Sequence, residues 1–394
     1  MATITSTEPA GAGAAFDLTL TEAQALVQRT ARDFATEKLL PIAADIDEQG
    51  RIPAAILGEL ASLGFMGVYV PEELGGAGAD VVSYILACEE INRACASTGV
   101  VMSAHNSLVC DPLLRHATPA QQARWLRPLA RGEMLGCFAM TEPGAGSDAA
   151  GMRTTAIRDG AGWVINGTKN FITNGASAGV VLVFAQAEPG SRYQGITAFV
   201  VDKPSKGLSV GKVERKLGIK GSDTAQLVFE DVRIGDEQRI GDVGAGFKVA
   251  LGALDGGRIG IAAQAVGIAR ACLEDSLAYA KSRQAFGKPI AELQAIQAML
   301  ADMATGVDAA RLLTWRAATL KDRGEPFTAE AAMAKLFASD LAMQAARDCV
   351  QIFGGYGYMK DYPAERHYRD AKITEIYEGT TEIMKLVIAE DMLG

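Results

Sequence analysis

The chain has 394 residues and a globular composition, 49% hydrophobic and 22% charged, which argues against a disordered protein and predicts two or three domains. Its 38 Lys and Arg against 47 Asp and Glu give a formal net charge of −9, which argues against a nucleic-acid or anionic-membrane surface, since both need clustered cations. The six cysteines form no CxxC pair and there are three histidines, so the sequence indicates no disulfide framework and no metal site.

The amino-terminal segment shows no recognisable targeting sequence. Its first fifteen residues are small and polar, with an acid and no Arg, and match neither a signal peptide nor a typical transit peptide. Residues 1–18 are therefore expected to be a flexible leader. The longest apolar runs, such as VVLVFA at 180–185, are too short to span a bilayer. We expect a soluble, cytoplasmic protein.

Helical patterns dominate residues 19–135. Thr21 and Gln24 stand at capping-box spacing at the start of TEAQALVQRTARDF, where apolar residues then recur on one face, so a helix is predicted there. Similar patterns follow at 83–95 and 119–130, and the glycine-rich stretch EELGGAGAD predicts a loop between helices.

Strand patterns replace helical ones over residues 136–240. TTAIRDGAGWVING has an Asp-Gly corner between two alternating runs, which predicts a β-hairpin. Further β-branched segments lie at 180–188, 196–202 and 224–234. Helical patterns return over 241–394, including a long stretch at 257–283 and a last helix at about 381–393. The predicted fold is α+β and mainly helical, with an N-terminal helical domain, a middle β-barrel or sandwich domain and a C-terminal helical bundle.

Common nucleotide-binding motifs are missing. GAGSDA at 144–149 and GAGFKV at 244–249 both lack the third glycine of the dinucleotide-binding pattern GxGxxG. The sequence contains no GxxxxGK[ST], so a P-loop is also excluded.

Six segments are more specific than packing alone requires: CFAMTEPGAGSD (137–148), WVINGTKNFITN (163–174), LDGGRIG (254–260), YAKSRQAFGKPI (279–290), QIFGGYGY (351–358) and RDAKITEIYEGTTEI (369–383). Together they resemble the acyl-CoA dehydrogenase family, most closely its short-chain members, from about residue 19 onward. The resemblance implies a homotetramer with non-covalent FAD, part of whose site comes from a neighbouring subunit. It also implies α,β-dehydrogenation of an acyl-CoA to the trans-2-enoyl-CoA, with electrons passed to an electron-transfer flavoprotein.

Glu378 is the candidate catalytic base. It lies between Ile376, Tyr377 and Gly379, and burial among apolar groups would raise its pKa from the ordinary value of about 4.3, at which a carboxylate is a weak base. The segment alone fits equally well an ordinary loop carboxylate before a helix. Family resemblance implies the base, with its backbone N–H binding the thioester oxygen. Some family members carry the base just before the Arg of LDGGRIG, where this chain has Gly257.

The same resemblance implies the cofactor contacts. They are Phe138, Thr141, Gly146, Ser147, Phe171, Thr173, Arg283, Phe286, Gln294, Gln351, Gly354, Gly355, Thr380, Thr381 and Glu382. Other interpretations remain open: a tight strand-to-strand loop for the first four, a solvated helix-end cation for Arg283, and simple helix caps for the last three. Many relatives have Trp at the position of Phe171.

Substrate contacts implied by the resemblance are Ser147, Asp255, Arg258, Tyr377 and Gly379. Asp255 and Arg258 are three residues apart, so an ordinary helical ion pair is the competing interpretation. Three alternative functions also remain: an oxidase that uses oxygen, an oxidative decarboxylase of a dicarboxyl-CoA, and a non-catalytic acyl-CoA or flavin-binding scaffold. The sequence decides neither the length and branching of the acyl chain nor the pathway.

Overall fold

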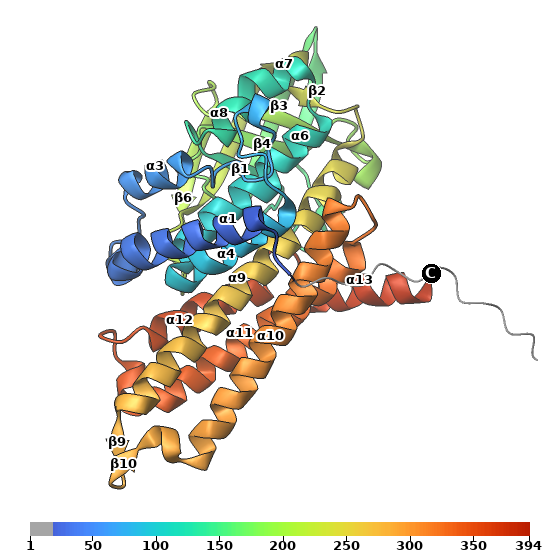
Figure 1. Ribbon diagram of the computed structural model, residues 1–394. Helices are drawn as coiled ribbons and strands as arrows, with labels where there is room; N and C mark the ends of the chain where they lie inside the picture. Colours follow the sequence, from blue (N-terminus) through green and yellow to red (C-terminus); the bar gives the residue numbers. More distant parts are fainter. Residues whose placement is uncertain (1–18) are drawn as a thin grey trace, which may run out of the picture.

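A computed structural model describes residues 19–394, and the expected leader at residues 1–18 lies outside this range. Helices of the N-terminal part lie between a β-sheet and a long C-terminal bundle (Figure 1). The predicted α+β, mainly helical architecture is confirmed. Within residues 19–394, no helix combines the length and apolar character that crossing a membrane requires.

The N-terminal part is built around helix α4. Its helices are α1 (Glu22–Phe34), α2 (Ala43–Gln49), α3 (Ala54–Ser62), α4 (Val81–Ala94), α5 (Ala96–Ala104), α6 (Asp111–His116), α7 (Pro119–Gln121) and α8 (Arg127–Ala130). Single 3₁₀ or π-helical turns are η1 (Ala35–Leu39), η2 (Leu40–Ile42), η3 (Glu72–Leu74), η4 (His105–Cys110) and η5 (Gln122–Leu126). The predicted capping box at Thr21 and Gln24 is present. Every residue of α4 except Arg93 is buried, so α4 forms the centre of this part.

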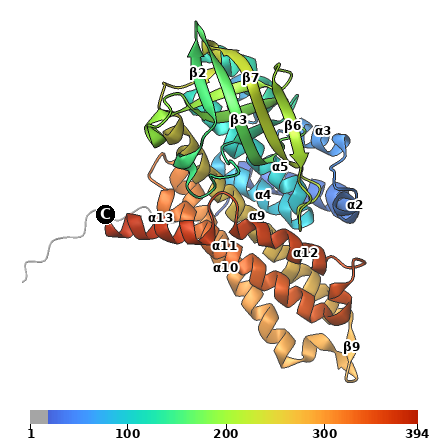
Figure 2. The ribbon, with the colours of Figure 1, turned by 180° about the vertical axis from the view of Figure 1, so that it is seen from behind.

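The middle part is an eight-stranded sheet, seen most clearly from behind (Figure 2). Its strands are β1 (Gly136–Ala139), β2 (Thr155–Asp159), β3 (Gly162–Thr173), β4 (Val180–Gln186), β5 (Ile196–Asp202), β6 (Leu208–Val213), β7 (Thr224–Gly235) and β8 (Arg239–Ile240). The order is β6-β7-β3-β2-β4-β5-β8, and β1 pairs in parallel with β4. The predicted hairpin is confirmed, with Asp159 opposite Gly162. All of β4 is buried, as expected for a continuous apolar run.

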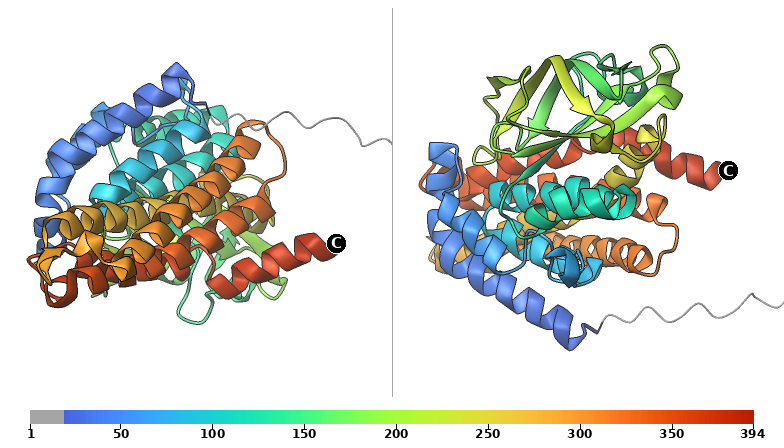
Figure 3. Two further views of the ribbon diagram at one scale, coloured as in Figure 1. Left: turned by 60° about the horizontal axis from the view of Figure 1, so that its bottom comes forward. Right: turned by 90° about the horizontal axis from the view of Figure 1, so that it is seen from above.

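The C-terminal part is a bundle of long helices that run side by side (Figure 3, left). The helices of this part are α9 (Gly246–Ser282), α10 (Gln294–Asp322), α11 (Thr328–Phe353), α12 (Ala364–Ala371) and α13 (Thr381–Leu393), of which α9, α10 and α11 are the long ones. A two-stranded hairpin of β9 (Gln284–Ala285) and β10 (Lys288–Pro289) connects α9 to α10. Helix α9 is central and packs against α4, α10 and α11. Helix α13, at the positions predicted for the last helix, projects away from the bundle (Figure 1).

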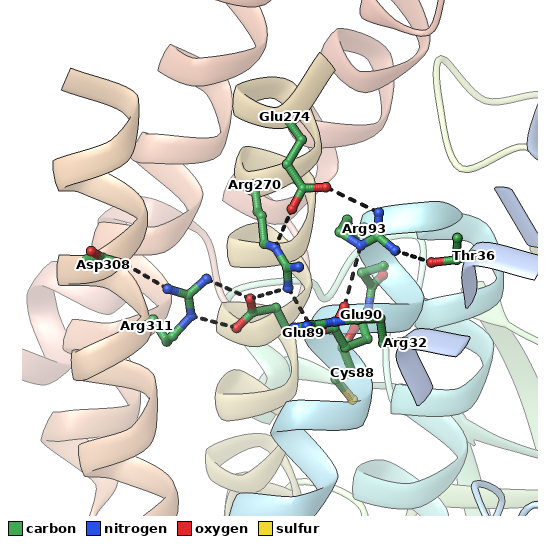
Figure 4. Close-up of polar contacts among 11 residues, drawn as sticks. Arg32, Thr36, Cys88, Glu89, Glu90, Arg93, Arg270, Glu274, Asp308 and Arg311 are labelled. Carbon is green, nitrogen blue, oxygen red and sulfur yellow. Dashed lines mark hydrogen bonds and ion pairs between the residues drawn. The ribbon is translucent and has the colours of Figure 1, made fainter. Parts of the chain in front are cut away.

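A network of ion pairs joins the N-terminal helices to the bundle (Figure 4). Glu89 and Glu90 of α4 are only 3% and 0% exposed. Arg270 of α9 contacts both, at 3.1 and 2.9 Å, while Arg311 of α10 lies 2.8 Å from Glu89 and Arg32 of α1 lies 2.7 Å from Glu90. Burial opposes ionisation of Glu90, but Arg32 and Arg270 outweigh it and hold its pKa below the ordinary value. The network thus fixes α9 against α4.

A second junction ties all three parts together just before the candidate base. Arg369 of α12 donates to both carboxylate oxygens of Asp47 on α2, at 3.0 and 2.6 Å. The neighbouring carboxylate of Asp370 accepts the backbone N–H of Ile219, in the loop between β6 and β7, at 2.5 Å. Burial raises the pKa of Asp370 to about 6. These contacts fix the start of the segment that leads from α12 to residue 378.

Candidate active site

Glu378 sits in a strained turn between η11 (Lys372–Glu375) and α13. Its φ is +55°, and that of Gly379 is +104°, both in the left-handed region that L side chains disfavour. A Cβ at Gly379 would lie 2.5 Å from Met384 Cε, the end of a flexible side chain that can move, so it is the positive φ that favours glycine there. Thr380 caps α13 by accepting the N–H of Ile383 at 3.4 Å. The turn is therefore fixed at its carboxyl end by the helix that follows.

The Glu378 carboxylate faces the α9 backbone at Gly257. A Cβ at Gly257 would overlap with Glu378 Oε2, and the same Cβ would lie 2.9 Å from Leu108 Cδ2. Leu108 of η4 packs with Ala104 and Ala253 in a small apolar cluster that Phe138 also contacts. Within residues 19–394 no hydrogen bond reaches the buried Oε2 atom of Glu378. The carboxylate of Glu378 therefore lies in apolar surroundings, at the place where a side chain at position 257 of α9 would otherwise be.

Burial dominates the acidity of Glu378 and raises its pKa to about 8, against the opposing charges of Lys335 and Arg258. A carboxylate with such a pKa is a much stronger base than an exposed one, and pKa values near the working pH are characteristic of catalytic acids and bases. As a residue Glu378 is half-buried, but its Oε2 atom is buried, which fits a base more closely than an ordinary loop carboxylate; the catalytic role stays a prediction.

Two cations contact the backbone of this turn. Arg258 Nε donates to the Glu378 carbonyl at 3.3 Å, and Lys335 Nζ, from α11, donates to the Gly379 carbonyl at 2.7 Å. Arg258 also forms the i,i+3 ion pair with Asp255, at 2.6 Å, that was one of the two sequence interpretations. Thr328 donates to the other carboxylate oxygen of Asp255 at 2.7 Å. The pair lies beside the candidate base, so Asp255 and Arg258 stay candidates for substrate contacts.

The Tyr377 side chain is held in the helical core. Its hydroxyl hydrogen-bonds the side-chain oxygen of Gln264 on α9, and Gln264 Nε2 donates to the Ala96 carbonyl at 3.2 Å. This chain of contacts anchors the residue before the base to both α9 and α5. The Tyr377 side chain thus points into the helical core, and Tyr377 is linked to the site because it precedes Glu378 in the chain.

The first cofactor segment forms a loop after β1. Gly146 and Ser147 are exposed, and a Cβ at Gly146 would meet no atom within 4 Å. Phe138 packs on Phe184 with ring centroids 4.8 Å apart. The Thr141 carbonyl accepts the Asn170 N–H at 2.8 Å, which places the loop beside the end of β3. An open glycine backbone here can approach a ligand closely.

Phe171 lies at an irregularity of β3, where the register with β7 shifts between Lys169 and Ile172. Its φ is +57° and its side chain is 60% exposed. Thr173 is the last residue of the same strand. An exposed aromatic ring beside an open glycine loop fits a flat, ring-containing ligand such as the isoalloxazine of a flavin.

A buried ion pair holds the loop after β1 in place. Lys169 Nζ lies 2.8 Å from Glu142 Oε1 and donates to the Met140 carbonyl at 2.9 Å. Glu142 also accepts the backbone N–H groups of Arg153 and Thr154, at 2.6 and 2.9 Å. The pair therefore connects both ends of the loop to β3.

The second cofactor group lies at the opposite end of the molecule. Arg283, Gly354 and Gly355 line a cavity of about 480 Å³ together with Tyr279, Phe353 and Tyr356. Phe286 is 90% exposed in the hairpin that joins β9 to β10, which Figure 1 places far from the sheet. Gln294 begins α10, and Gln351 lies exposed near the end of α11. One chain does not bring the two groups together, so a single ligand can contact both only between two copies.

At the start of α13, Thr380 caps the helix and Thr381 donates to the Glu375 carbonyl at 3.5 Å, and contact of either residue with the cofactor stays a prediction. Glu382 is exposed in the first turn.

Sequence reasoning missed Lys335, Gln264, Leu108 and the Lys169–Glu142 pair. A usable indication existed for Lys335, because it stands with Ala331, Ala338 and Ala342 at helical spacing on the buried face of α11. The other contacts depend on the tertiary arrangement of segments distant in sequence.

Comparison with known proteins identifies the family. Its N-terminal, middle and C-terminal domain models, described as those of acyl-CoA dehydrogenase, match residues 21–133, 137–232 and 244–393. The bovine "Short-chain specific acyl-CoA dehydrogenase, mitochondrial" (Bos taurus) is 53% identical over 95% of this chain and 91% of its own. Butyryl-CoA dehydrogenase from Megasphaera elsdenii superposes with a TM-score of 0.95 at 45% identity, covering 96% of this chain and all of its own. A chain from a structure described as the electron transferring flavoprotein of Acidaminococcus fermentans gives 0.95 at 46%, with the same coverage. The chain therefore belongs to the acyl-CoA dehydrogenase family.

Proposed function

We propose that this protein catalyses the FAD-dependent α,β-dehydrogenation of a short, straight or branched saturated acyl-CoA to the trans-2-enoyl-CoA, with Glu378 as the base. The observation that carries the proposal is the buried Oε2 atom of Glu378, which has no hydrogen-bond partner within residues 19–394 and lies against the α9 backbone at Gly257. The short-chain preference is supported by the bovine and M. elsdenii relatives, whose names specify short-chain and butyryl substrates.

The chemistry needs a proton removed from the α carbon and a hydride removed from the β carbon. FAD, when bound, supplies the hydride acceptor. Glu378 removes the α proton, and the apolar cluster of Leu108, Ala104 and Ala253 keeps water from its carboxylate. The positive charges of Arg258 and Lys335 stabilise the ionised form that accepts the proton. The Glu378 backbone N–H is proposed to bind the thioester oxygen as negative charge develops there.

Two subunits would share the cofactor. On one chain the open loop at Thr141, Gly146 and Ser147 and the exposed ring of Phe171 would hold the flavin ring. The cavity at Arg283, Gly354 and Gly355 on a neighbouring chain would hold the adenosine and pyrophosphate end, since a guanidinium suits phosphate. Support comes from the wide separation of the two groups in one chain. The proposed assembly is a homotetramer.

Electrons are proposed to leave to an electron-transfer flavoprotein, which the family resemblance and the similarity to the A. fermentans chain support. An oxidase on the same fold would instead pass them to oxygen, and a non-catalytic scaffold would bind acyl-CoA without accepting them.

The experiment that tests this function is an anaerobic titration of the purified holoprotein with butyryl-, isobutyryl-, 2-methylbutyryl-, octanoyl- and palmitoyl-CoA, followed by flavin absorbance. Bleaching by the short-chain thioesters and not by palmitoyl-CoA is expected. Peroxide formation at the full turnover rate in air, without an added acceptor, would instead indicate the oxidase. Acyl-CoA binding without bleaching would indicate the scaffold.

A further inference from the structure

Lys335 is a buried lysine beneath the turn that carries Glu378. Its side chain is 0% exposed, and its Nζ donates to the Gly379 carbonyl at 2.7 Å. Within residues 19–394, no carboxylate lies within 4.0 Å of Nζ, so Lys335 forms no ion pair there. A buried ammonium group whose hydrogen-bond partner is a neutral carbonyl is costly, and such groups usually have a specific reason to be retained.

Two other buried lysines show the contrast. Lys169 is paired with Glu142 at 2.8 Å, and Lys321 lies 3.4 Å from Asp111. Each of these pairs compensates the charge locally, as stability alone requires. Lys335 lacks such a partner, and the contact it makes is with the backbone of the candidate base turn.

The contact completes a clamp on two consecutive carbonyl groups. Arg258 of α9 holds the Glu378 carbonyl at 3.3 Å, and Lys335 of α11 holds the next carbonyl, that of Gly379, at 2.7 Å. Both residues of the turn have positive φ, +55° and +104°. Because a left-handed Glu is disfavoured intrinsically, its conformation persists only where surrounding contacts hold it. Fixing the peptide groups on both sides of Gly379 fixes the direction in which the Glu378 side chain leaves the backbone.

Charge forms a second link between the two residues. The charged groups that act on Lys335 are Glu378 in the turn, Arg258 on α9, Glu375 in η11 and Asp340 on α11. Burial lowers the pKa of Lys335 to about 8, and Glu378 is the group that opposes burial most. Reciprocally, Lys335 is the group that most opposes the effect of burial on Glu378. Each charge is thus the main compensation for the other.

We propose that Lys335 is a positioning residue for the base: its hydrogen bond to the Gly379 carbonyl holds Glu378 in the left-handed conformation, and its charge favours the ionised carboxylate. This inference rests on the proposed role of Glu378.

Three substitutions separate the two contributions. Lys335→Met keeps the length of the side chain and removes both donor and charge, Lys335→Gln keeps a donor without the charge, and Lys335→Arg keeps both. The measurement is the rate of anaerobic flavin bleaching by butyryl-CoA in the holoprotein between pH 6 and 10. Lys335→Met should slow bleaching at pH 7 at least about tenfold and move the midpoint of the pH profile upward by about one unit or more. Lys335→Gln should show the upward shift with a smaller loss at high pH, and Lys335→Arg should keep the wild-type midpoint.

Lys321→Met is the matched control, because Lys321 is also buried, at 9% exposed, but lies 3.4 Å from the carboxylate of Asp111. It should lower the melting temperature without moving the pH midpoint. If Lys335→Met only lowers the melting temperature and leaves the rate and the midpoint at wild-type values, Lys335 is structural and the proposal is wrong. If Lys335→Met does not fold, the Lys335→Gln and Lys335→Arg variants provide the test. Equal midpoints in their pH profiles of bleaching would show that the proposal is wrong. Unimpaired bleaching by Glu378→Gln would instead refute the base itself.

Discussion

Gly257 and Glu378 are 121 residues apart in the chain, yet the carboxylate of Glu378 occupies the space that a side chain at Gly257 would need. The absence of a side chain at Gly257 therefore allows the Glu378 carboxylate to reach the apolar cluster around Leu108. Two residues that lie far apart in the sequence, a glycine on a helix and an acid in a loop, form one feature of the site.

Gly257→Ala should consequently displace the Glu378 carboxylate and lower the rate of flavin bleaching by roughly 100-fold, since misplacing a catalytic group by about 1 Å has effects of this size. Gly252→Ala is the matched control, because it lies on the same helix and its Cβ would meet no atom within 4 Å. It should leave the rate unchanged. Equal rates in both variants, measured by anaerobic stopped flow, would mean that the carboxylate does not act from this position.

The pH dependence of bleaching should follow the ionisation of Glu378. Its pKa is raised to about 8 by burial, so the ionised base is the minor form at pH 7 and becomes the major form above pH 8. The bleaching rate should rise as pH increases through this value. A rate that is constant from pH 6.5 to 9 would contradict a buried carboxylate as the base.

Glu378→Gln should stabilise the fold at alkaline pH. Because the folded pKa lies above the unfolded one, Glu378 reduces stability progressively as pH rises from about 4.5 to about 8, where the unfolded carboxylate is ionised and the folded one resists ionisation. Glutamine has no such cost. The melting temperature of the variant should therefore exceed that of the wild type at pH 8 and match it near pH 4. A variant that is less stable at pH 8 would indicate that Glu378 is a structural residue.

Lys169→Met should loosen the loop that is proposed to hold the flavin. The substitution leaves Glu142 buried without its partner, and breaking a buried ion pair this way costs about 3–5 kcal/mol of unfolding free energy. The ratio of flavin to protein absorbance should fall after purification. The double variant Lys169→Met, Glu142→Gln should recover part of the stability, because it removes the uncompensated charge. If Lys169→Met keeps the flavin content of the wild type, the Lys169–Glu142 ion pair is not needed for cofactor binding.

Much of the fold followed from local patterns in the sequence. The capping box at Thr21, the hairpin corner at Asp159 and the last helix are each specified by neighbouring residues, and all three are confirmed. Interactions between residues close in the sequence determine such features, so they can be predicted from a single sequence.

Contacts between distant segments could not be obtained that way. The Asp255–Arg258 pair was foreseen as one of two interpretations because its spacing is local. Lys335 and Gln264 were not, because their meaning depends on which turn lies against α11 and α9. Likewise, the wide separation of strand β3 from the β9–β10 hairpin within one chain appears only when the sheet and bundle are placed in space (Figure 1).

The most direct test of the whole account compares the wild-type holoprotein with Glu378→Gln, mixing each anaerobically with butyryl-CoA and recording flavin absorbance. If Glu378 is the base, the wild type should bleach rapidly, and the variant should bind butyryl-CoA with little or no bleaching. Bleaching of Glu378→Gln at the wild-type rate would contradict the central claim that this buried carboxylate removes the α proton.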